Sequence, residues 1–355
     1  MIETFPLRLP LAVEYRWAKG VQTERRGVLV RAVVDGAEGW GECAPPIHLD
    51  TDADALAGEV AALAAGLDTE AEGFLAALDG RRPDMRLRCG IAAAWLSARA
   101  AAQGLPLSVL VAREAGLPAP ATIVPVNGLV TEETPEAAGA RAGALVADGF
   151  RTLKVKCWAD RAADLSRVAA IRAAAPDAVL RLDANESWAP DWAMEHMAAL
   201  AFYRIAYVEQ PIPSAHPLAA IAAFRATSPI PVALDESTTD PESLAAIIAH
   251  RAADHVIIKT QRAGGPDRAA RMIRMAWAAG LGITVTQSLE SAVGVAVAAH
   301  VAAMLPQPIP DCGLAMGRFL ARDVAASPPI RAGAMAVPPG PGLGLSGISP
   351  WGISP

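Results

Sequence analysis

Three acidic residues in the second half of the chain stand at a constant spacing. Asp183, Glu209 and Asp235 are 26 residues apart, and each ends a short apolar run. This interval is about one strand–helix unit, so the three carboxylates would fall at equivalent depths on neighbouring parallel strands. Converging carboxylates repel one another unless a cation neutralises them, and oxygen-only ligands suit magnesium or manganese. The spacing therefore predicts a site for a hard divalent cation. The alternative is that each acid only caps the next helix.

Lysines accompany these acids on two further runs. In RTLKVKCW, residues 151–158, Lys154 and Lys156 alternate with apolar residues and so share one face of a strand, and Lys259 ends the run HVIIK. A metal between two ammonium groups suits proton abstraction beside a carboxylate. The metal would bind the carboxylate and stabilise an enediolate, and a lysine with a lowered pKa would take the proton. Lysines at solvated strand ends are the alternative.

These side chains need elements that bring them together. From about residue 120 onward, β-rich runs alternate with alanine-rich amphipathic stretches. The eight runs are IVPVNGLV, RTLKVKCW, AVLRLDAN, IAYVEQP, PVALDES, HVIIKTQ, GITVTQS and IPDCGLA. Eight evenly spaced units predict an α/β fold, a closed (β/α)8-type (TIM-like) barrel with its active site at the carboxyl ends of the strands. An open doubly wound sheet is the alternative.

The rest of the chain has another pattern. Residues 1–120 combine antiparallel strand signals with helical stretches and predict an α+β capping domain with a mobile lid loop at about 17–27. Residues 121–325 form the predicted barrel domain. Residues 326–355 are rich in Gly and Pro and predict an irregular tail that packs back on the capping domain. GLGLSG, residues 342–347, fits a dinucleotide-binding pattern, but no βαβ unit follows it.

Composition and charge argue against several classes of binding partner. The net charge of −6 and the scattered basic residues argue against nucleic acid and against an anionic membrane, and no apolar run is long enough to span one. The four cysteines form no CxxC pair, so free thiols in a reducing compartment are expected. With no secretory signal pattern, these features predict a cytoplasmic enzyme for a small-molecule carboxylate, either a monomer or a homo-oligomer.

Together, the motifs KVK, DAN, VEQP, LDES and IIKTQRAGG, with GWGECAP near the start, resemble the enolase superfamily, specifically its muconate-lactonising-enzyme-like group. The resemblance covers almost the whole chain and implies a capping domain on a modified (β/α)7β barrel. It implies that Asp183, Glu209 and Asp235 bind Mg2+, with Mn2+ as a possible substitute. Lys156 and Lys259 would then be the acid/base lysines on opposite faces of the substrate.

The resemblance also implies supporting roles. Lys154 would sit behind Lys156 and act on it electrostatically. Three further residues would lie at or near the metal: Arg181, Asn185 and Glu236. Substrate-binding or supporting roles near the last two strands fall to Ser288, Glu290 and Gly313.

Within the group, TQSLESAVG and DCGLAMGRFLARDV resemble the strand-seven and strand-eight segments of o-succinylbenzoate synthases. Dipeptide epimerases of the group usually carry a DxD pattern in the second segment, whereas here Cys312 and Gly313 follow Asp311. The implied reaction is the Mg2+-dependent syn-dehydration of 2-succinyl-6-hydroxy-2,4-cyclohexadiene-1-carboxylate to o-succinylbenzoate, through an enediolate. The resemblance thus implies a carbon–oxygen lyase (hydro-lyase) of menaquinone biosynthesis. Lys156 would remove the proton and Lys259 would contribute its charge.

Other readings stay open at this stage. An N-succinylamino acid racemase or dipeptide epimerase would use the same metal and both lysines. A non-catalytic barrel is disfavoured by the intact set of acids and lysines, and a sugar-acid dehydratase by the lack of a His–Asp pair near strands six and seven. Cys157 and Trp158 depart from the small residue that many relatives carry, which could reshape the pocket rim. Arg25 and Arg26 of the expected lid could meet a substrate carboxylate.

Overall fold

The computed structural model describes residues 1–17 and 20–352. The N-terminal region forms a three-stranded antiparallel sheet in the order β1-β2-β3, with bounds Ile2–Trp17, Gly20–Val34 and Ala37–Cys43. Asp35 and Gly36 turn the chain between β2 and β3, both with positive φ. Residues 20–27, expected as part of a lid loop, instead form the start of β2 and pair with β1, with Gly27 opposite Leu7. Residues 18–19 of that loop lie outside the described residues.

Four helices accompany this sheet, namely α1 (Ala53–Ala64), α2 (Phe74–Gly80), α3 (Met85–Ala102) and α4 (Leu107–Ala115). The almost entirely buried α3 lies directly on β3. Glycines permit this close approach: a Cβ on Gly39 would lie 2.1 Å from the Ala98 backbone nitrogen, and one on Gly41 would lie 2.1 Å from the Gly90 carbonyl oxygen. The GWG segment thus allows the capping sheet to approach a helix backbone more closely than side chains permit.

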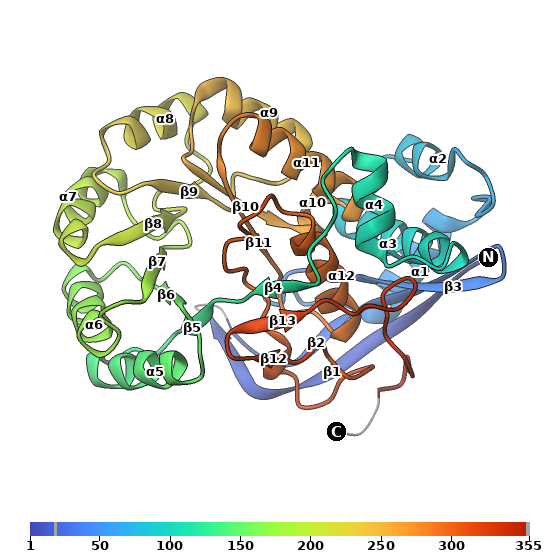
Figure 1. Ribbon diagram of the computed structural model, residues 1–355, viewed down its shortest axis with the longest axis horizontal. Helices are drawn as coiled ribbons and strands as arrows, with labels where there is room; N and C mark the ends of the chain where they lie inside the picture. Colours follow the sequence, from blue (N-terminus) through green and yellow to red (C-terminus); the bar gives the residue numbers. More distant parts are fainter. Residues whose placement is uncertain (18–19, 353–355) are drawn as a thin grey trace.

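A curled parallel sheet forms the second region (Figure 1). Its seven strands run in sequence order and are β5 (Gly128–Val130), β6 (Thr152–Lys156), β7 (Val179–Asp183), β8 (Ile205–Glu209), β9 (Val232–Leu234), β10 (His255–Lys259) and β11 (Gly282–Thr286). The eighth run is reduced to two bridges, in which Cys312 pairs with Val126 and Gly313 with Thr286. Because these bridges reach both ends of the seven-stranded sheet, they close it into the barrel that the sequence predicts.

Helices pack around the outside of this barrel (Figure 1). They are α5 (Pro135–Ala147), α6 (Arg161–Ala174), α7 (Pro190–Leu200), α8 (Leu218–Thr227), α9 (Pro241–His250), the short α10 (Thr260–Ala263), α11 (Pro266–Ala278) and α12 (Ala292–Ala303), with 3-10 turns η1 (Ala201–Tyr203) and η2 (Gly317–Phe319). Local sequence sets their starts. Thr134 caps α5 ahead of Pro135, and Asp240 forms a capping box with Ser243 at α9. Among the described residues, no helix is long and apolar enough to cross a membrane.

The C-terminal tail is only partly irregular. Strands β12 (Ile330–Arg331) and β13 (Ala334–Ala336) form a small sheet with β4 (Ile123–Pro125). Further along, Gly342 forms a bridge with Pro106 and its carbonyl oxygen accepts a hydrogen bond from the Leu107 amide at the start of α4. The GLGLSG stretch that starts at Gly342 therefore packs on the N-terminal helices and opens no βαβ unit.

The capping sheet also touches the barrel at β10. Gln261, just after β10, donates to the Glu42 carbonyl oxygen at 2.8 Å and accepts from the Ala44 amide at 3.0 Å. The buried Arg88 of α3 ion-pairs with Asp267 of α11 at 2.8 Å. These contacts place the Pro45–His48 turn over the barrel mouth.

Candidate active site

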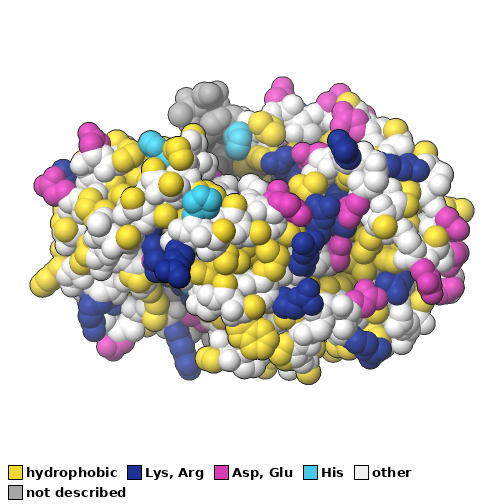
Figure 2. All heavy atoms as spheres, turned by 90° about the horizontal axis from the view of Figure 1, so that it is seen from above, with side chains coloured by type: hydrophobic (Ala, Val, Ile, Leu, Met, Phe, Trp, Pro, Cys, Tyr) yellow, Lys and Arg dark blue, Asp and Glu magenta, His cyan; other side chains and the backbone are white. Residues whose placement is uncertain are grey.

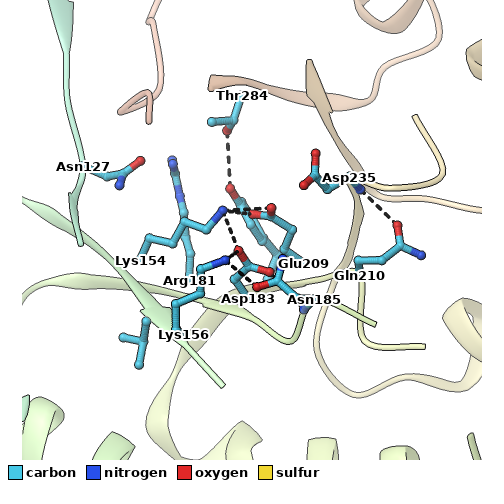
Figure 3. Close-up of polar contacts among 12 residues, drawn as sticks. Asn127, Lys154, Lys156, Arg181, Asp183, Asn185, Glu209, Gln210, Asp235 and Thr284 are labelled. Atoms are coloured by element: carbon cyan, nitrogen blue, oxygen red, sulfur yellow. Dashed lines mark hydrogen bonds and ion pairs between the residues drawn. The ribbon is translucent and has the colours of Figure 1, made fainter. Parts of the chain in front are cut away.

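Strand ends of the barrel bring the predicted residues together. β6, β7 and β8 lie side by side in register, so Lys156 stands next to Asp183 and Asp183 next to Glu209. Lys259 ends β10, and Asp235 follows β9 by one residue. Figure 3 shows Lys154, Lys156, Asp183 and Glu209 pointing toward one another. The three carboxylates are at most 1% exposed.

Asp183 accepts ion pairs from both lysines of β6. Its Oδ2 lies 2.8 Å from Lys154 Nζ and 2.6 Å from Lys156 Nζ. Burial alone would raise the pKa of Asp183, but the two ammonium groups outweigh it and hold this pKa well below its usual range. Asp183 is therefore a stable anion beside the candidate base.

Glu209 shares Lys154 with Asp183. Its Oε2 lies 2.8 Å from Lys154 Nζ. Burial, and next the neighbouring Asp183 charge, raise the pKa of Glu209 to about 8, and the positive charge of Lys154 only partly offsets them. Burial disfavours the ammonium of Lys154 as well, yet the surrounding carboxylates raise the pKa of Lys154 well above its ordinary value.

Asp235 has cations of its own. Lys259 Nζ lies 2.6 Å from its Oδ2, and Arg262 ion-pairs with Oδ1. Burial raises the pKa of Asp235, but Lys259 and Arg262 outweigh it and lower the pKa to about 2. Gln210 accepts a hydrogen bond from the Asp235 amide at 3.1 Å and so fixes the start of this loop (Figure 3).

The donor chemistry of these carboxylates fits a divalent cation. All their ligand atoms are hard oxygens, which Mg2+ and Mn2+ prefer. One cationic group already lies 2.8 Å from both Asp183 and Glu209, so both can be served by one cation. Among the described residues, no group of three or more His, Cys, Asp or Glu side chains is arranged so that it could hold a metal ion. Lysine and arginine side chains are paired with the carboxylates at the barrel mouth instead.

Asn185 and Glu236 extend the polar network toward the opening. Lys156 donates to the Asn185 side-chain oxygen, and the Asn185 amide donates to Glu236 Oε1 at 3.2 Å. Asn185 has a φ of 43°, a left-handed conformation that Asn tolerates better than most residues. Burial raises the pKa of Glu236, and the Asp235 charge adds to this. Asn185 thus contacts Lys156 directly, and Glu236 is linked to Lys156 through Asn185.

Arg181 lies deeper in the barrel. Its guanidinium donates to the Asp311 carbonyl oxygen and lies 5.2 Å from the centre of the Tyr207 ring. At the same level His255 bonds the Thr284 hydroxyl at 2.8 Å. Arg181 thus ties β7 to the eighth segment beneath the carboxylates.

A cavity of about 750 Å³ opens above these groups. Its floor includes Lys154, Lys156, Asp183 and Lys259, and Ser288 and Gly313 form part of its wall. The outer walls are mainly apolar and come from the capping domain and the late barrel loops: Leu11, Val13, Pro45, Pro46, Ile47, Leu289, Ala315, Met316 and Phe319. The site therefore joins a charged floor to an apolar upper chamber.

Three residues considered near the substrate lie outside the cavity lining. Glu290 is 1% exposed, and its Oε1 accepts a hydrogen bond from the amide of Ser288, which does line the cavity, so its position is a supporting one. Arg25 is 2% exposed and donates to the Pro45 carbonyl oxygen. Arg26 pairs with Glu24 at 3.1 Å on the outside of the sheet. The strand pairing of β2 places both arginines away from the cavity.

Several site residues were not identified from the sequence. Arg262 lies in the short α10 and ion-pairs with Asp235. The sequence feature that could have identified it is its position three residues after Lys259. Asn127 lines the cavity just before β5, whereas Trp158, which the sequence analysis associated with the pocket rim, lines it just after β6. No local motif marks Asn127, since its place depends on the closure of the barrel.

A parallel barrel with paired lysines and acids at its mouth defines a class of (β/α)-barrel enzyme. Residues 137–347 match the family model described as "Enolase C-terminal domain-like". Two similar relatives are named o-succinylbenzoate synthase. The Thermobifida fusca protein is 38% identical over 223 residues, which cover 61% of this chain and 67% of the relative. The Mycolicibacterium smegmatis protein is 33% identical over 313 residues, which cover 84% and 78%.

Solved structures agree with this assignment. The L-Ala-D/L-Glu epimerase of Bacillus subtilis, solved as a substrate-liganded complex, superposes with a TM-score of 0.86 at 27% identity, covering 98% of this chain and 99% of that one. The chain belongs to the enolase superfamily. Enzymes of this superfamily act on small molecules and typically use a divalent metal.

Proposed function

We propose that the protein is an o-succinylbenzoate synthase, which dehydrates 2-succinyl-6-hydroxy-2,4-cyclohexadiene-1-carboxylate. The observation that carries this proposal is the pair Lys156 and Lys259, which line one cavity while each is ion-paired to a different buried carboxylate. The names of the Thermobifida and Mycolicibacterium relatives support the same reaction.

Asp183, Glu209 and Asp235 are the proposed ligands of Mg2+, with Mn2+ as a substitute. When bound, the metal would supply positive charge for the substrate carboxylate. Lys154 holds Asp183 and Glu209 together, and Arg262 orients Asp235. These contacts organise the carboxylates before a substrate arrives, which is the preorganisation that electrostatic catalysis requires.

Lys156 is the proposed base. Its Nζ removes the proton next to the substrate carboxylate, and the same ammonium then donates that proton to the departing hydroxyl, so that one water leaves from one face. Asp183 and Asn185 hold Nζ in place through the 2.6 Å ion pair and the hydrogen bond to the Asn185 oxygen. Lys259 contributes positive charge from the β10 side.

The upper chamber supports a substrate whose distal part is weakly polar. Its lining includes Leu289, Met316 and Phe319. Asp311, the acid of the eighth segment that could hold a substrate amine, lies outside the lining, and the Cys312 after it is fully buried. This favours a substrate without an amine near that segment, as in the dehydration.

A second candidate is racemisation or epimerisation of an N-acylated amino acid. The presence of Lys156 and Lys259 on one cavity favours it, because a two-base reaction needs a proton donor on each face of the substrate. The Bacillus subtilis epimerase that superposes on this chain catalyses a reaction of this kind, by its name.

The decisive experiment is to incubate the purified protein with Mg2+ and the cyclohexadiene substrate and to follow the aromatic product by absorbance. We expect turnover, and we expect Lys259→Arg to keep part of it because only positive charge is required at that position. Racemisation of N-succinyl amino acids without dehydration would contradict the proposal. Loss of both reactions in Lys259→Arg would assign a proton-transfer role to Lys259.

The setting of the reaction is also a proposal. All four cysteines are free and buried, which supports a reducing, cytoplasmic compartment. Figure 2 shows Lys/Arg and Asp/Glu side chains interspersed on one face of the molecule, and this mixture supports a small-molecule substrate over a nucleic acid. The aromatic product would serve menaquinone biosynthesis.

A further inference from the structure

Buried side chains fix the main chain of the segment that follows Lys156. The Trp158 amide donates to both oxygens of Asp164 at 3.2 Å, and the Trp158 carbonyl oxygen accepts from the Trp188 indole at 3.0 Å. Asp164 and Trp188 are completely buried. Both backbone polar groups of Trp158 are therefore fixed by side chains from the barrel shell.

Arg167 on α6 joins this segment to two others. Its guanidinium donates to the Lys156 carbonyl oxygen at 2.8 Å, to the Glu132 carbonyl oxygen at 2.8 Å and to Asp164 at 3.1 Å. The arginine is fully buried, and its guanidinium carbon lies 4.0 Å from the centre of the Trp158 ring. One buried cation thus contacts the main chain of the candidate base, the loop after β5 and an aromatic ring.

Trp158 itself borders the substrate cavity. Its side chain is 39% exposed and lines the cavity together with Thr131 and Glu133, the neighbours of Glu132. The ring therefore packs on Arg167 and presents its exposed part to the chamber that holds Lys156. A large planar ring at this point limits the width of that chamber.

We propose that Trp158 contacts the substrate and determines which distal group the cavity accepts, and that Arg167 is a positioning residue for both this ring and Lys156. The proposal concerns the same site as the proposed function. It rests on the proposed function only in the kinetic assay, which follows dehydration of the cyclohexadiene substrate. The distal group is apolar or planar, because the ring offers a flat surface and an aromatic face. Asp164 accepts a hydrogen bond from Arg167 and so orients its guanidinium.

Spectroscopy tests the proposal without turnover. The chain has eight tryptophans, so protein labelled with 5-fluorotryptophan gives separable 19F signals, and Trp158→Phe assigns the one of interest. We expect that signal to shift when Mg2+ and o-succinylbenzoate are added, and to shift and broaden in Arg167→Met. Arg99→Met is the matched control, since Arg99 lies 4.7 Å from the Trp95 ring in the capping domain. It should move the Trp95 signal and leave the Trp158 signal in place.

Kinetics separate the two roles. Trp158→Leu should raise KM for the cyclohexadiene substrate about tenfold with kcat nearly unchanged, and should alter its preference over N-succinyl amino acids by a similar factor. Arg167→Met should lower kcat about tenfold or more, with partial rescue in Arg167→Lys. A KM within twofold of the parent in Trp158→Leu, together with no ligand-induced 19F shift, overturns the proposal. If the parent protein turns over neither substrate, the proposed function fails, while the 19F shift with a bound carboxylate still decides the role of Trp158.

Discussion

Two groups of buried carboxylates lie in this molecule, and their charges are compensated differently. At the barrel mouth, Asp183, Glu209 and Asp235 are neutralised by lysine and arginine side chains. At the seam between the capping domain and the barrel, Glu42 and Glu290 are nearly as buried, at 1% exposed each. There the compensation comes mainly from backbone amides, a hydroxyl and the buried Arg25.

The seam is built around the start of α12. Glu42 accepts from the Ser291 amide at 3.0 Å, the Ser291 hydroxyl at 2.6 Å and the Gly294 amide at 3.2 Å. A Cβ on Gly294 would lie 2.6 Å from Glu290 Oε2 and 2.8 Å from Glu42 Oε2, so both carboxylates crowd this glycine. The amides at a helix N-terminus favour an anion, which explains how Glu42 is accommodated without a lysine.

The difference separates chemistry from structure. Asp183 lines the open cavity, and so do Lys154, Lys156 and Lys259, the lysines that are paired with the mouth carboxylates. The seam carboxylates face fixed amides outside the cavity lining, so they can hold two domains together but cannot reach a substrate. A buried acid near a barrel strand end is therefore insufficient evidence for catalysis, and Glu290 is the example in this chain.

The largest expected effect is at the mouth. Lys156→Ala should lower kcat about a thousandfold, because general-base catalysis contributes roughly 10²–10⁴ in rate. Steady-state kinetics measure this, with circular dichroism as the control for folding. Glu290→Gln at the seam should keep most of the activity at pH 6. Comparable losses in the two variants would abolish the distinction between the regions.

At the seam the expected effect is on stability. Glu42→Ala removes a negative charge that favours the buried Arg25 guanidinium and leaves amides at the start of α12 unpaired. Each buried polar group left unsatisfied in this way costs about 1–3 kcal/mol, and for a chain of this size we expect Tm to fall by roughly 5 °C or more. Calorimetry of the whole protein measures it. An unchanged Tm would mean that the seam contributes nothing to domain attachment.

Metal affinity should change only in variants of the carboxylates at the barrel mouth. Asp183→Asn should weaken Mn2+ binding at least about tenfold, measured by calorimetric titration, since one anionic oxygen ligand is lost. Removal of metal with EDTA should stop turnover, and added Mg2+ should restore it. Glu290→Gln is the matched control, a buried carboxylate of the other group, and equal weakening in that variant would contradict the assignment of ligands.

The smallest expected effect is a pH dependence at the seam. Burial, and next the Glu42 charge, raise the pKa of Glu290 to about 8. The folded state therefore binds this proton more tightly than the unfolded chain, whose Glu has a pKa of about 4.3. Its contribution to stability is fully present below about pH 4 and falls as pH rises toward 8.

Glu290→Gln removes this dependence. We compare the free energy of unfolding of the variant with that of the parent protein. This difference should shift in favour of the variant by about 1 kcal/mol or more between pH 5 and pH 8. Urea unfolding at the two pH values measures the difference. A relative gain at pH 5 instead would show that Glu290 is held as an anion, with Arg25 as its partner.

Much of the fold was predictable because its pattern is local. The alternation of β-rich and alanine-rich runs predicts eight strand units, of which seven form the parallel sheet and the eighth forms only bridges. The constant spacing of Asp183, Glu209 and Asp235 indicates neighbouring strand ends. The placement of Lys154 and Lys156 on one face follows from strand geometry alone. Each of these inferences depends on a period that the chain itself carries.

The remaining features depend on contacts between distant segments. Strand pairing converted the expected lid into part of β2, and this pairing buried Arg25 beside Pro45. Glu290 was predicted to bind substrate or to support the site, and contacts with the start of α12 and with Glu42 bury it outside the cavity lining. The sequence alone determined which side chains recur at barrel strand ends, because periodicity is local. Only the tertiary structure decided which of them face the cavity, because burial and charge pairing depend on neighbours far away in the chain.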